Sequence, residues 1–174
     1  MSMQIHKIKY SIVLLGFIII SCGIFDTTET NKNVTKLYVT LQQQDKVAIY
    51  DTPDLTLLKT IDINFTGSNI KDTPHFIVID DINGYWFVTT IASGYIAQFK
   101  LVTNEFVDKI FVGDSPALLT LNKNDKKLYC SRMMPMGNMM PGSESTIIHE
   151  IDYSGNTLMT LNEFNIPSPV KVLQ

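Results

Sequence analysis

The stretch Tyr85-Trp86-Phe87-Val88-Thr89 occurs three times along the chain in related versions, and this repetition decides the fold. The first version is Lys36-Leu37-Tyr38-Val39-Thr40, 49 residues earlier, and the third is Lys127-Leu128-Tyr129-Cys130-Ser131, 42 residues later. A second phrase, Ile96-Ala97-Gln98-Phe99-Lys100, has counterparts in the same order at residues 47–51 and 148–152. A period of this size predicts an array of like structural units.

Each unit is expected to contain four short strands. In the second copy they cover residues 76–79, 85–90, 95–101 and 106–112, with polar turns between them. Runs of this length, rich in β-branched and aromatic residues and broken by Gly, Asn and Asp, predict an antiparallel meander. Four-stranded sheets repeated every 40 to 50 residues or so are the blades of a β-propeller. The sequence therefore predicts an all-β chain, a β-propeller of four-stranded antiparallel blades; the alternative is a meander within a sandwich or an open sheet.

About three blades are present, at about residues 36–66, 74–113 and 116–165, and residues 168–174 start the next one. A blade hides its apolar faces only against neighbouring blades, and a ring usually has about four to eight of them. Residues 36–174 are therefore expected to be a partial propeller, the N-terminal part of a longer protein or a truncated reading frame. Two chains completing one ring is the alternative. The first copy lacks an inner strand before Lys36, which fits a ring that a strand from the other terminus seals.

The sequences of the repeats resemble those of a known family. Tyr38-Val39-Thr40, residues 47–52, Lys59-Thr60-Ile61 and Pro74-His75 resemble the YVTN-type β-propeller repeat, and the likeness spans about residues 36–174. Asn83-Gly84 stands where that family usually has Asp-Gly. The resemblance implies the propeller fold. It leaves the activity open, because some propellers are lactonases or other hydrolases that hold a cation in the central channel.

Residues 1–21 have the features of a lipoprotein signal peptide. Lys7 and Lys9 precede an uncharged apolar run at 12–20, and Ile19-Ile20-Ser21-Cys22 resembles a bacterial lipobox whose cysteine becomes lipidated. The run is shorter than the roughly 20 apolar residues that a membrane span needs. Residues 22–35 are polar and unpatterned, so a flexible tether is expected there. We expect a lipid-anchored protein of the bacterial cell envelope, periplasmic or surface-exposed, that contacts the membrane through Cys22.

The charge of the chain argues against a nucleic-acid-binding protein, and its cysteine content argues against an intrachain disulfide. Removal of residues 1–21 takes away Lys7 and Lys9 and no acidic residue, which leaves 12 basic and 17 acidic residues and a formal charge of −5. Such a surface repels phosphates, so no nucleic acid partner is expected. With Cys22 lipidated, Cys130 remains alone and cannot form an intrachain disulfide. Its position within a strand predicts a buried thiol.

Two insertions indicate where a ligand binds. Ser131 and Ile148 are 17 residues apart, whereas the matching positions in the first two copies are 7 apart. A second insertion separates Ile61 from Pro74 by 13 residues. Because antiparallel strands alternate in direction, both insertions are expected on one rim, where His75 begins an inner strand. Long loops on a rigid scaffold often carry recognition, so residues 64–75 and 132–145 are the predicted binding rim for a protein or small-molecule ligand.

Five of the eight methionines lie in the larger insertion: Met133, Met134, Met136, Met139 and Met140. Methionine suits adaptable apolar contacts, which favours a partner surface. Thioethers also bind Cu(I), so Met136, Met139 and His75 are candidate ligands in an alternative copper site. His75 follows Pro74 as in the family repeat, which implies packing or hydrogen bonding; a haem or other ligand role is the alternative.

No catalytic residues are predicted, because no Ser-His-Asp or Cys-His set occurs at an interpretable spacing. The sequence favours a binding scaffold with no cofactor. The alternative is a propeller enzyme or redox module, lactonase-like or binding haem or copper, whose metal ligands lie in further blades.

Overall fold

The computed structural model describes residues 35–67, 69–132 and 145–167. Val34–Gln174 make up one compact unit. Apart from the short 3-10 turn η1 (Gln42–Gln44), all regular structure in the described part is β-strand. Among these residues there is no helix with the length and hydropathy that a membrane crossing requires. The lipobox, the tether and the methionines at 133–140 lie outside the described residues.

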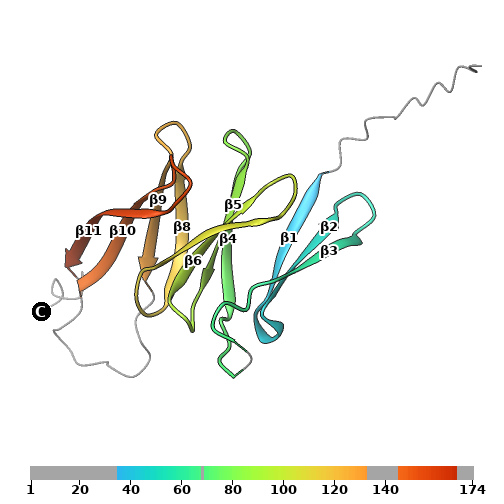
Figure 1. Ribbon diagram of the computed structural model, residues 1–174, viewed down its shortest axis with the longest axis horizontal. Helices are drawn as coiled ribbons and strands as arrows, with labels where there is room; N and C mark the ends of the chain where they lie inside the picture. The colour runs from blue at the N-terminus through green and yellow to red at the C-terminus, as the bar shows by residue number, and fades with distance from the viewer. Residues whose placement is uncertain (1–34, 68, 133–144, 168–174) are drawn as a thin grey trace, which may run out of the picture. The chain divides into compact units, whose positions relative to one another are not determined.

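The strands form three antiparallel sheets, which we call blades 1 to 3 (Figure 1). Blade 1 contains β1 (Lys36–Leu41), β2 (Lys46–Asp51) and β3 (Thr56–Asp62) in sequence order. Blade 2 contains β4 (Pro74–Asp80), β5 (Tyr85–Thr90), β6 (Tyr95–Lys100) and β7 (Phe106–Phe111). Blade 3 contains β8 (Pro116–Asn122), β9 (Lys127–Arg132), β10 (Ser145–Asp152) and β11 (Met159–Pro167).

The predicted four-strand unit is confirmed in the second copy, where each strand bound lies within two residues of its expected place. β1, β5 and β9 carry the three versions of the repeated phrase, so they occupy the same position in their blades. β1 has a single neighbour in its sheet, β2. Blade 1 therefore lacks, within the described residues, the innermost strand that β4 and β8 provide in the other blades.

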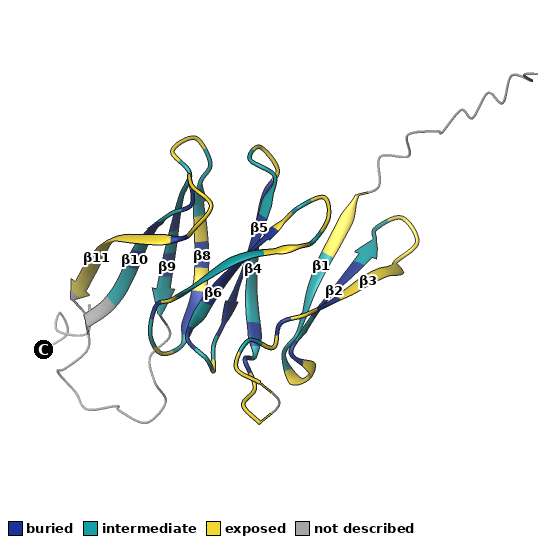
Figure 2. Cartoon of the chain, in the orientation of Figure 1, coloured by how far each residue is buried: buried dark blue, intermediate teal, exposed yellow. Residues whose placement is uncertain are grey.

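Blade 2 is the centre of the structure, because it packs against a neighbour on each face (Figure 2). Successive side chains of a strand point to opposite faces. Trp86 and Val88 accordingly pack with blade 1, whereas Phe87 packs with blade 3. All three are fully buried. A strand covered on both faces needs consecutive apolar residues, and this requirement explains the stretch Tyr85-Trp86-Phe87-Val88.

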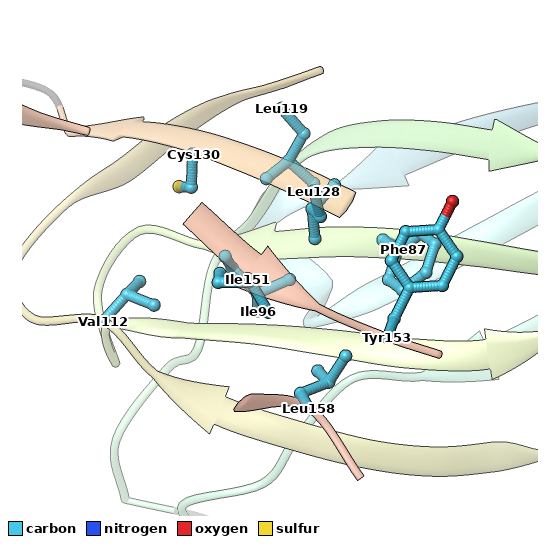
Figure 3. Close-up of a cluster of buried hydrophobic side chains, with 9 residues drawn as sticks. All are labelled: Phe87, Ile96, Val112, Leu119, Leu128, Cys130, Ile151, Tyr153 and Leu158. Atoms are coloured by element: carbon cyan, nitrogen blue, oxygen red, sulfur yellow. The ribbon is translucent and has the colours of Figure 1, made fainter. Parts of the chain in front are cut away.

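Each pair of neighbouring blades shares one apolar core. The core between blades 1 and 2 is made of Val47, Ile49, Ile61, Ile63, Trp86, Val88, Ala97 and Phe99. Within it the rings of Trp86 and Phe99 stack at 4.2 Å between centroids. The core between blades 2 and 3 contains the side chains drawn in Figure 3: Phe87, Ile96, Val112, Leu119, Leu128, Cys130, Ile151, Tyr153 and Leu158. The predicted burial of Cys130 is thus confirmed.

The last residue of the repeated phrase links blade 1 to blade 2 and blade 2 to blade 3. Thr40 Oγ1 donates to the carbonyl oxygen of His75 at 3.2 Å, and Thr89 Oγ1 donates to that of Ala117 at 3.1 Å. Thr89 Oγ1 also accepts from the backbone N–H of Phe76 at 3.1 Å. The recurrence of threonine at this point in the sequence therefore has a structural reason: its hydroxyl satisfies inner-strand backbone groups at the junction of two blades.

We predict that Thr89→Val destabilises the fold by about 1–3 kcal/mol, because the isosteric side chain leaves buried polar backbone groups without their partner. Chemical denaturation measures the change in the free energy of unfolding. Thr60→Val is the matched control, because Thr60 is an exposed strand residue and its replacement should change stability by no more than about 0.5 kcal/mol. Equal effects of the two substitutions would show that the Thr89 hydroxyl contributes nothing.

Candidate functional site

The strand ends define two rims. The loop-rich rim carries the β1–β2, β3–β4, β5–β6 and β7–β8 connections, together with the end of β9 and the start of β10 (Figure 1). The hairpin rim at the opposite ends of the strands carries the turns at 52–55, 81–84, 101–105, 123–126 and 153–158. The chain enters β1 at the hairpin rim. The described insertion, residues 63–73, lies on the loop-rich rim as the sequence predicts.

His75 is the second residue of β4 and is half-buried at the loop-rich rim. Its Nδ1 lies 2.7 Å from Nε2 of Gln42, which belongs to the β1–β2 connection of the preceding blade. An amide nitrogen can only donate, so Nδ1 is the acceptor in this contact. His75 is therefore held between two blades by its side chain and, through Thr40, by its carbonyl.

An open hollow of about 400 Å³ lies beside this pair and is lined by residues 40–44. Gln43 and Gln44 are exposed there. Lys71 crosses from the insertion and donates through Nζ to the carbonyl oxygen of Gln43 at 2.6 Å. The hollow is thus lined by side-chain amides, which can donate and accept hydrogen bonds in several directions, and the Lys71 ammonium group contacts one of its lining residues.

Two buried carboxylates give the insertion its shape. Asp72 Oδ2 accepts from the backbone N–H groups of Phe65 at 2.6 Å and Thr66 at 3.2 Å, and from the Thr66 hydroxyl at 3.2 Å. Asp45, in the left-handed region at φ 51°, accepts from the N–H of Thr73 through Oδ1 at 2.8 Å. Both side chains are buried. The insertion is therefore an ordered loop tied to blade 1.

Blade 3 contributes Arg132 to the same rim. Its Nε donates to the carbonyl oxygen of Asp114 at 2.8 Å. Gly113 lies beneath the guanidinium, where an added Cβ would come within 3.2 Å of its atoms, and its φ of +87° also favours glycine. The methionine-rich insertion begins at the next residue, Met133, which lies outside the described part.

The carboxylates of the hairpin rim are structural. Asp80 Oδ2 accepts from the Tyr153 hydroxyl at 2.7 Å and from Asn83 Nδ2 at 2.7 Å. Burial works to raise the pKa of Asp80, but these hydrogen bonds hold it below its usual value. Asp81 pairs with Lys123 across the two blades. In residues 35–67, 69–132 and 145–167, no three His, Cys, Asp or Glu side chains come together as a metal site.

His149 and Cys130 are register partners on the face of blade 3 that blade 2 covers. Burial raises the pKa of the Cys130 thiol to about 12. Burial also lowers the pKa of His149; the Glu163 carboxylate, 3.3 Å from Nδ1, opposes this shift, and Arg132 adds to it. Neither ring nitrogen of His149 has a well-aligned hydrogen bond in the described part of the chain. With only 3% of its surface exposed, His149 is not available to a ligand on the rim.

The sequence predicted the position of His75 and of the insertion at this rim, but it did not predict the residues that surround them. Gln42–Gln44 carry no motif typical of a site, and the contact of Gln42 with His75 depends on how two blades meet. Asp45 contacts a residue 28 positions along the chain, and Asp72 contacts residues 7 and 6 positions away. No local sequence pattern shows these contacts.

No protein-family model and no curated protein matches this chain. Solved structures do match. Hydrazine synthase from Kuenenia stuttgartiensis matches with 19% identity and a TM-score of 0.59, over 75% of this chain and 34% of that one. The periplasmic gluconolactonase of Pseudomonas aeruginosa matches with 16% identity and a TM-score of 0.58, over 76% and 37%. A Bacteroides caccae protein matches with 21% identity and a TM-score of 0.56, over 81% and 48%.

At these identities the likeness shows the fold alone. The matched structures are β-propeller proteins, and the predicted fold class is confirmed. This chain spans about a third to a half of the length of the structures cited above. The finer resemblance to the YVTN-type repeat stays a prediction, because no family model matches.

We predict that the free energy of unfolding decreases at acidic pH because of the protonation of His149. Its pKa in the folded protein lies below the value of about 6.5 expected for the unfolded chain, so the unfolded state takes up a proton more readily. The free energy of unfolding should therefore decrease as pH falls below about 6.5 toward the folded pKa.

Denaturation curves between pH 7.5 and 5 test this prediction. His149→Gln removes the titrating group and should flatten the decline over that window, whatever its effect on stability at pH 7.5. A variant whose stability follows the same pH slope as the parent would contradict the assignment.

Proposed function

We propose that this chain is the propeller scaffold of a lipid-anchored envelope protein, and that it binds a protein or small-molecule ligand at the loop-rich rim. The supporting observation is the asymmetry between the rims. Tight turns close the hairpin rim, whereas the loop-rich rim carries the ordered insertion at 63–73 and both ends of the insertion at 133–144. Extra connection length gathered at one end of a rigid stack is typical of a recognition surface.

The chemistry of the described rim supports a polar ligand. Gln43, Gln44 and Lys71 are exposed, and His75 and Gln42 form a fixed pair beside the hollow. Ile70, which is 58% exposed in the insertion, adds one apolar contact. The methionines at 133–140 would add adaptable apolar side chains to the proposed ligand contacts.

The position of the chain entry fits an anchor at Cys22. β1 begins at the hairpin rim, so a tether that precedes it would join the scaffold at the end of the strands opposite the proposed binding rim. A protein tethered in this way keeps its loop-rich rim free of the attachment.

Deletion of residues 133–142 should leave the fold intact and abolish ligand capture. The test is cross-linking in intact bacteria followed by affinity purification and mass spectrometry. The expected result is a species captured by the parent chain and lost from the deletion variant and from Lys71→Ala. Ile82→Ser, on the hairpin rim, is the control and should retain it. Capture that survives the deletion, or that is lost only in the control, would refute the proposed face.

Cys22→Ser should release the protein from the membrane fraction, because the thiol that carries the lipid is gone. Fractionation of cells and labelling with a fatty acid analogue measure the two effects. A variant that stays labelled and membrane-bound would disprove anchoring at Cys22.

The alternative of an enzyme or redox module is tested by elemental analysis of the purified chain. A stoichiometric metal would favour that alternative over a scaffold.

A further inference from the structure

The three large apolar side chains that are most exposed in the described part of the chain all lie at the hairpin rim. Val102 is 82% exposed, Ile82 69% and Leu55 63%. They belong to the β6–β7, β4–β5 and β2–β3 turns, which lie at the same ends of the strands in blades 1 and 2 (Figure 1). We call them the apolar tips. None of them belongs to either core, so the packing of the blades does not require apolar residues there.

The matching turns of blade 3 show that these positions can be polar. Ile82 is the second residue of its four-residue turn, as Asn124 is in the β8–β9 turn. Val102 follows the end of β6 by two residues, as Ser154 follows the end of β10. Asn124 and Ser154 are also exposed. The repeat therefore has polar side chains at the tips of blade 3 and apolar ones at the same positions of blade 2.

Leu55 is unfavourable at its own position. Its φ is 50°, in the left-handed region that bulky side chains rarely adopt. The matching residue of blade 2 is Asn104 at φ 60°, a residue type that tolerates this conformation better. The strand register on both sides of the two turns supports the match. Neither the backbone nor the packing favours leucine at this position, so its side chain points to a contact outside the chain.

Acidic residues beside two of the apolar tips are paired within the protein. Asp81, next to Ile82, forms an ion pair with Lys123 of the neighbouring blade. Glu105, at the end of the β6–β7 turn, forms an ion pair with Lys100 at 3.1 Å. A paired charge costs less to bring toward an apolar phase than a single one. These turns can therefore approach such a phase without exposing it to unpaired carboxylates at these two sites.

We propose that the apolar tips enter the surface of a lipid bilayer. This contact depends on the proposed function, because a lipid at Cys22 would hold the hairpin rim close to a membrane. The chain enters β1 at this rim, in blade 1. Thr35 is 13 positions after Cys22, and a flexible coil of that length would span about 20 Å on average. The tips of blades 1 and 2 would thus lie within reach of the anchored lipid.

A bilayer suits the apolar tips better than a protein partner does. The three side chains come from three separate turns, so they do not form the continuous apolar centre of a stable protein interface. Binding at a membrane surface needs only apolar side chains that reach the boundary between headgroups and acyl chains. Asp54, next to Leu55, would stay among the headgroups. Because an anchor already supplies proximity, a few such contacts suffice to orient the scaffold.

The test attaches the mature chain, residues 22–174, to phosphatidylcholine vesicles through a lipid that carries a maleimide group. Cys22 is the thiol that reacts, because the only other cysteine, Cys130, is buried and its burial raises the pKa of the thiol to about 12. This linkage replaces lipidation in the cell. The contact of the rim is therefore tested separately from natural anchoring, which the Cys22→Ser experiment in cells tests by itself.

A tryptophan placed at a tip reports contact with lipid. The fluorescence of Ile82→Trp should be quenched by phospholipids brominated near the headgroup end of their acyl chains, and its emission should shift to shorter wavelength. Trp86, the only native tryptophan, is fully buried and gives a constant background. Ile70→Trp is the matched control, because Ile70 is 58% exposed on the loop-rich rim, and its fluorescence should not be quenched.

Added charges test whether the apolar tips cause the contact. In the Ile82→Trp chain, Leu55→Asp and Val102→Asp should each weaken the contact about tenfold, and together they should abolish the quenching. Asn124→Asp with Asn156→Asp adds the same charge to exposed turns of blade 3 and should leave the quenching unchanged. All four positions are exposed, so both double variants should keep the thermal unfolding transition of the parent.

Three results would overturn the proposal. Equal quenching of the Ile82→Trp and Ile70→Trp chains would mean that the anchored protein has no preferred orientation. Quenching that survives Leu55→Asp with Val102→Asp would mean that the apolar tips do not make the contact. Quenching at neither rim would mean that the tips do not enter the bilayer and would leave them to a protein partner.

Discussion

The face-to-face packing of neighbouring sheets is the interaction on which this structure depends. Each blade is a thin meander with little interior of its own, and its apolar side chains leave water only where a second blade meets it. Blade 2 shows the full arrangement, because Trp86 and Val88 contribute to one core and Phe87 to the other. Hydrogen bonds from Thr40 and Thr89 fix the position of each blade along the strands of the next one. The same arrangement of blades therefore satisfies both the apolar contacts and these hydrogen bonds.

This constraint separates the positions that need a particular kind of side chain from those that do not. Strand positions have to fill a core of defined width, whereas connections at the strand ends only have to join them. On the hairpin rim the turns are short and carry structural contacts, such as Tyr153 with Asp80. On the loop-rich rim the chain has room for the insertion at 63–73, and buried Asp45 and Asp72 turn that insertion into a defined surface.

The repeated phrases predicted the strands of blade 2 and the missing inner strand of blade 1, because a strand covered on both faces leaves a direct mark in the sequence. The candidate site was less accessible. His75 could be placed on a rim from strand direction, but its contact with Gln42 depends on how two blades meet. The burial of His149 also escaped prediction, since a mid-strand histidine is compatible with either face until the register to Cys130 is known.

Hydrogen exchange of the backbone amides, followed residue by residue, tests the packing account most directly. If blades bury one another as described, β5 and β6 should exchange slowest, because their residues are almost all buried, and β3 should exchange much faster, because most of its residues are exposed. Comparable protection of β3 and β5, or rapid exchange throughout blade 2, would contradict the central role of face-to-face packing.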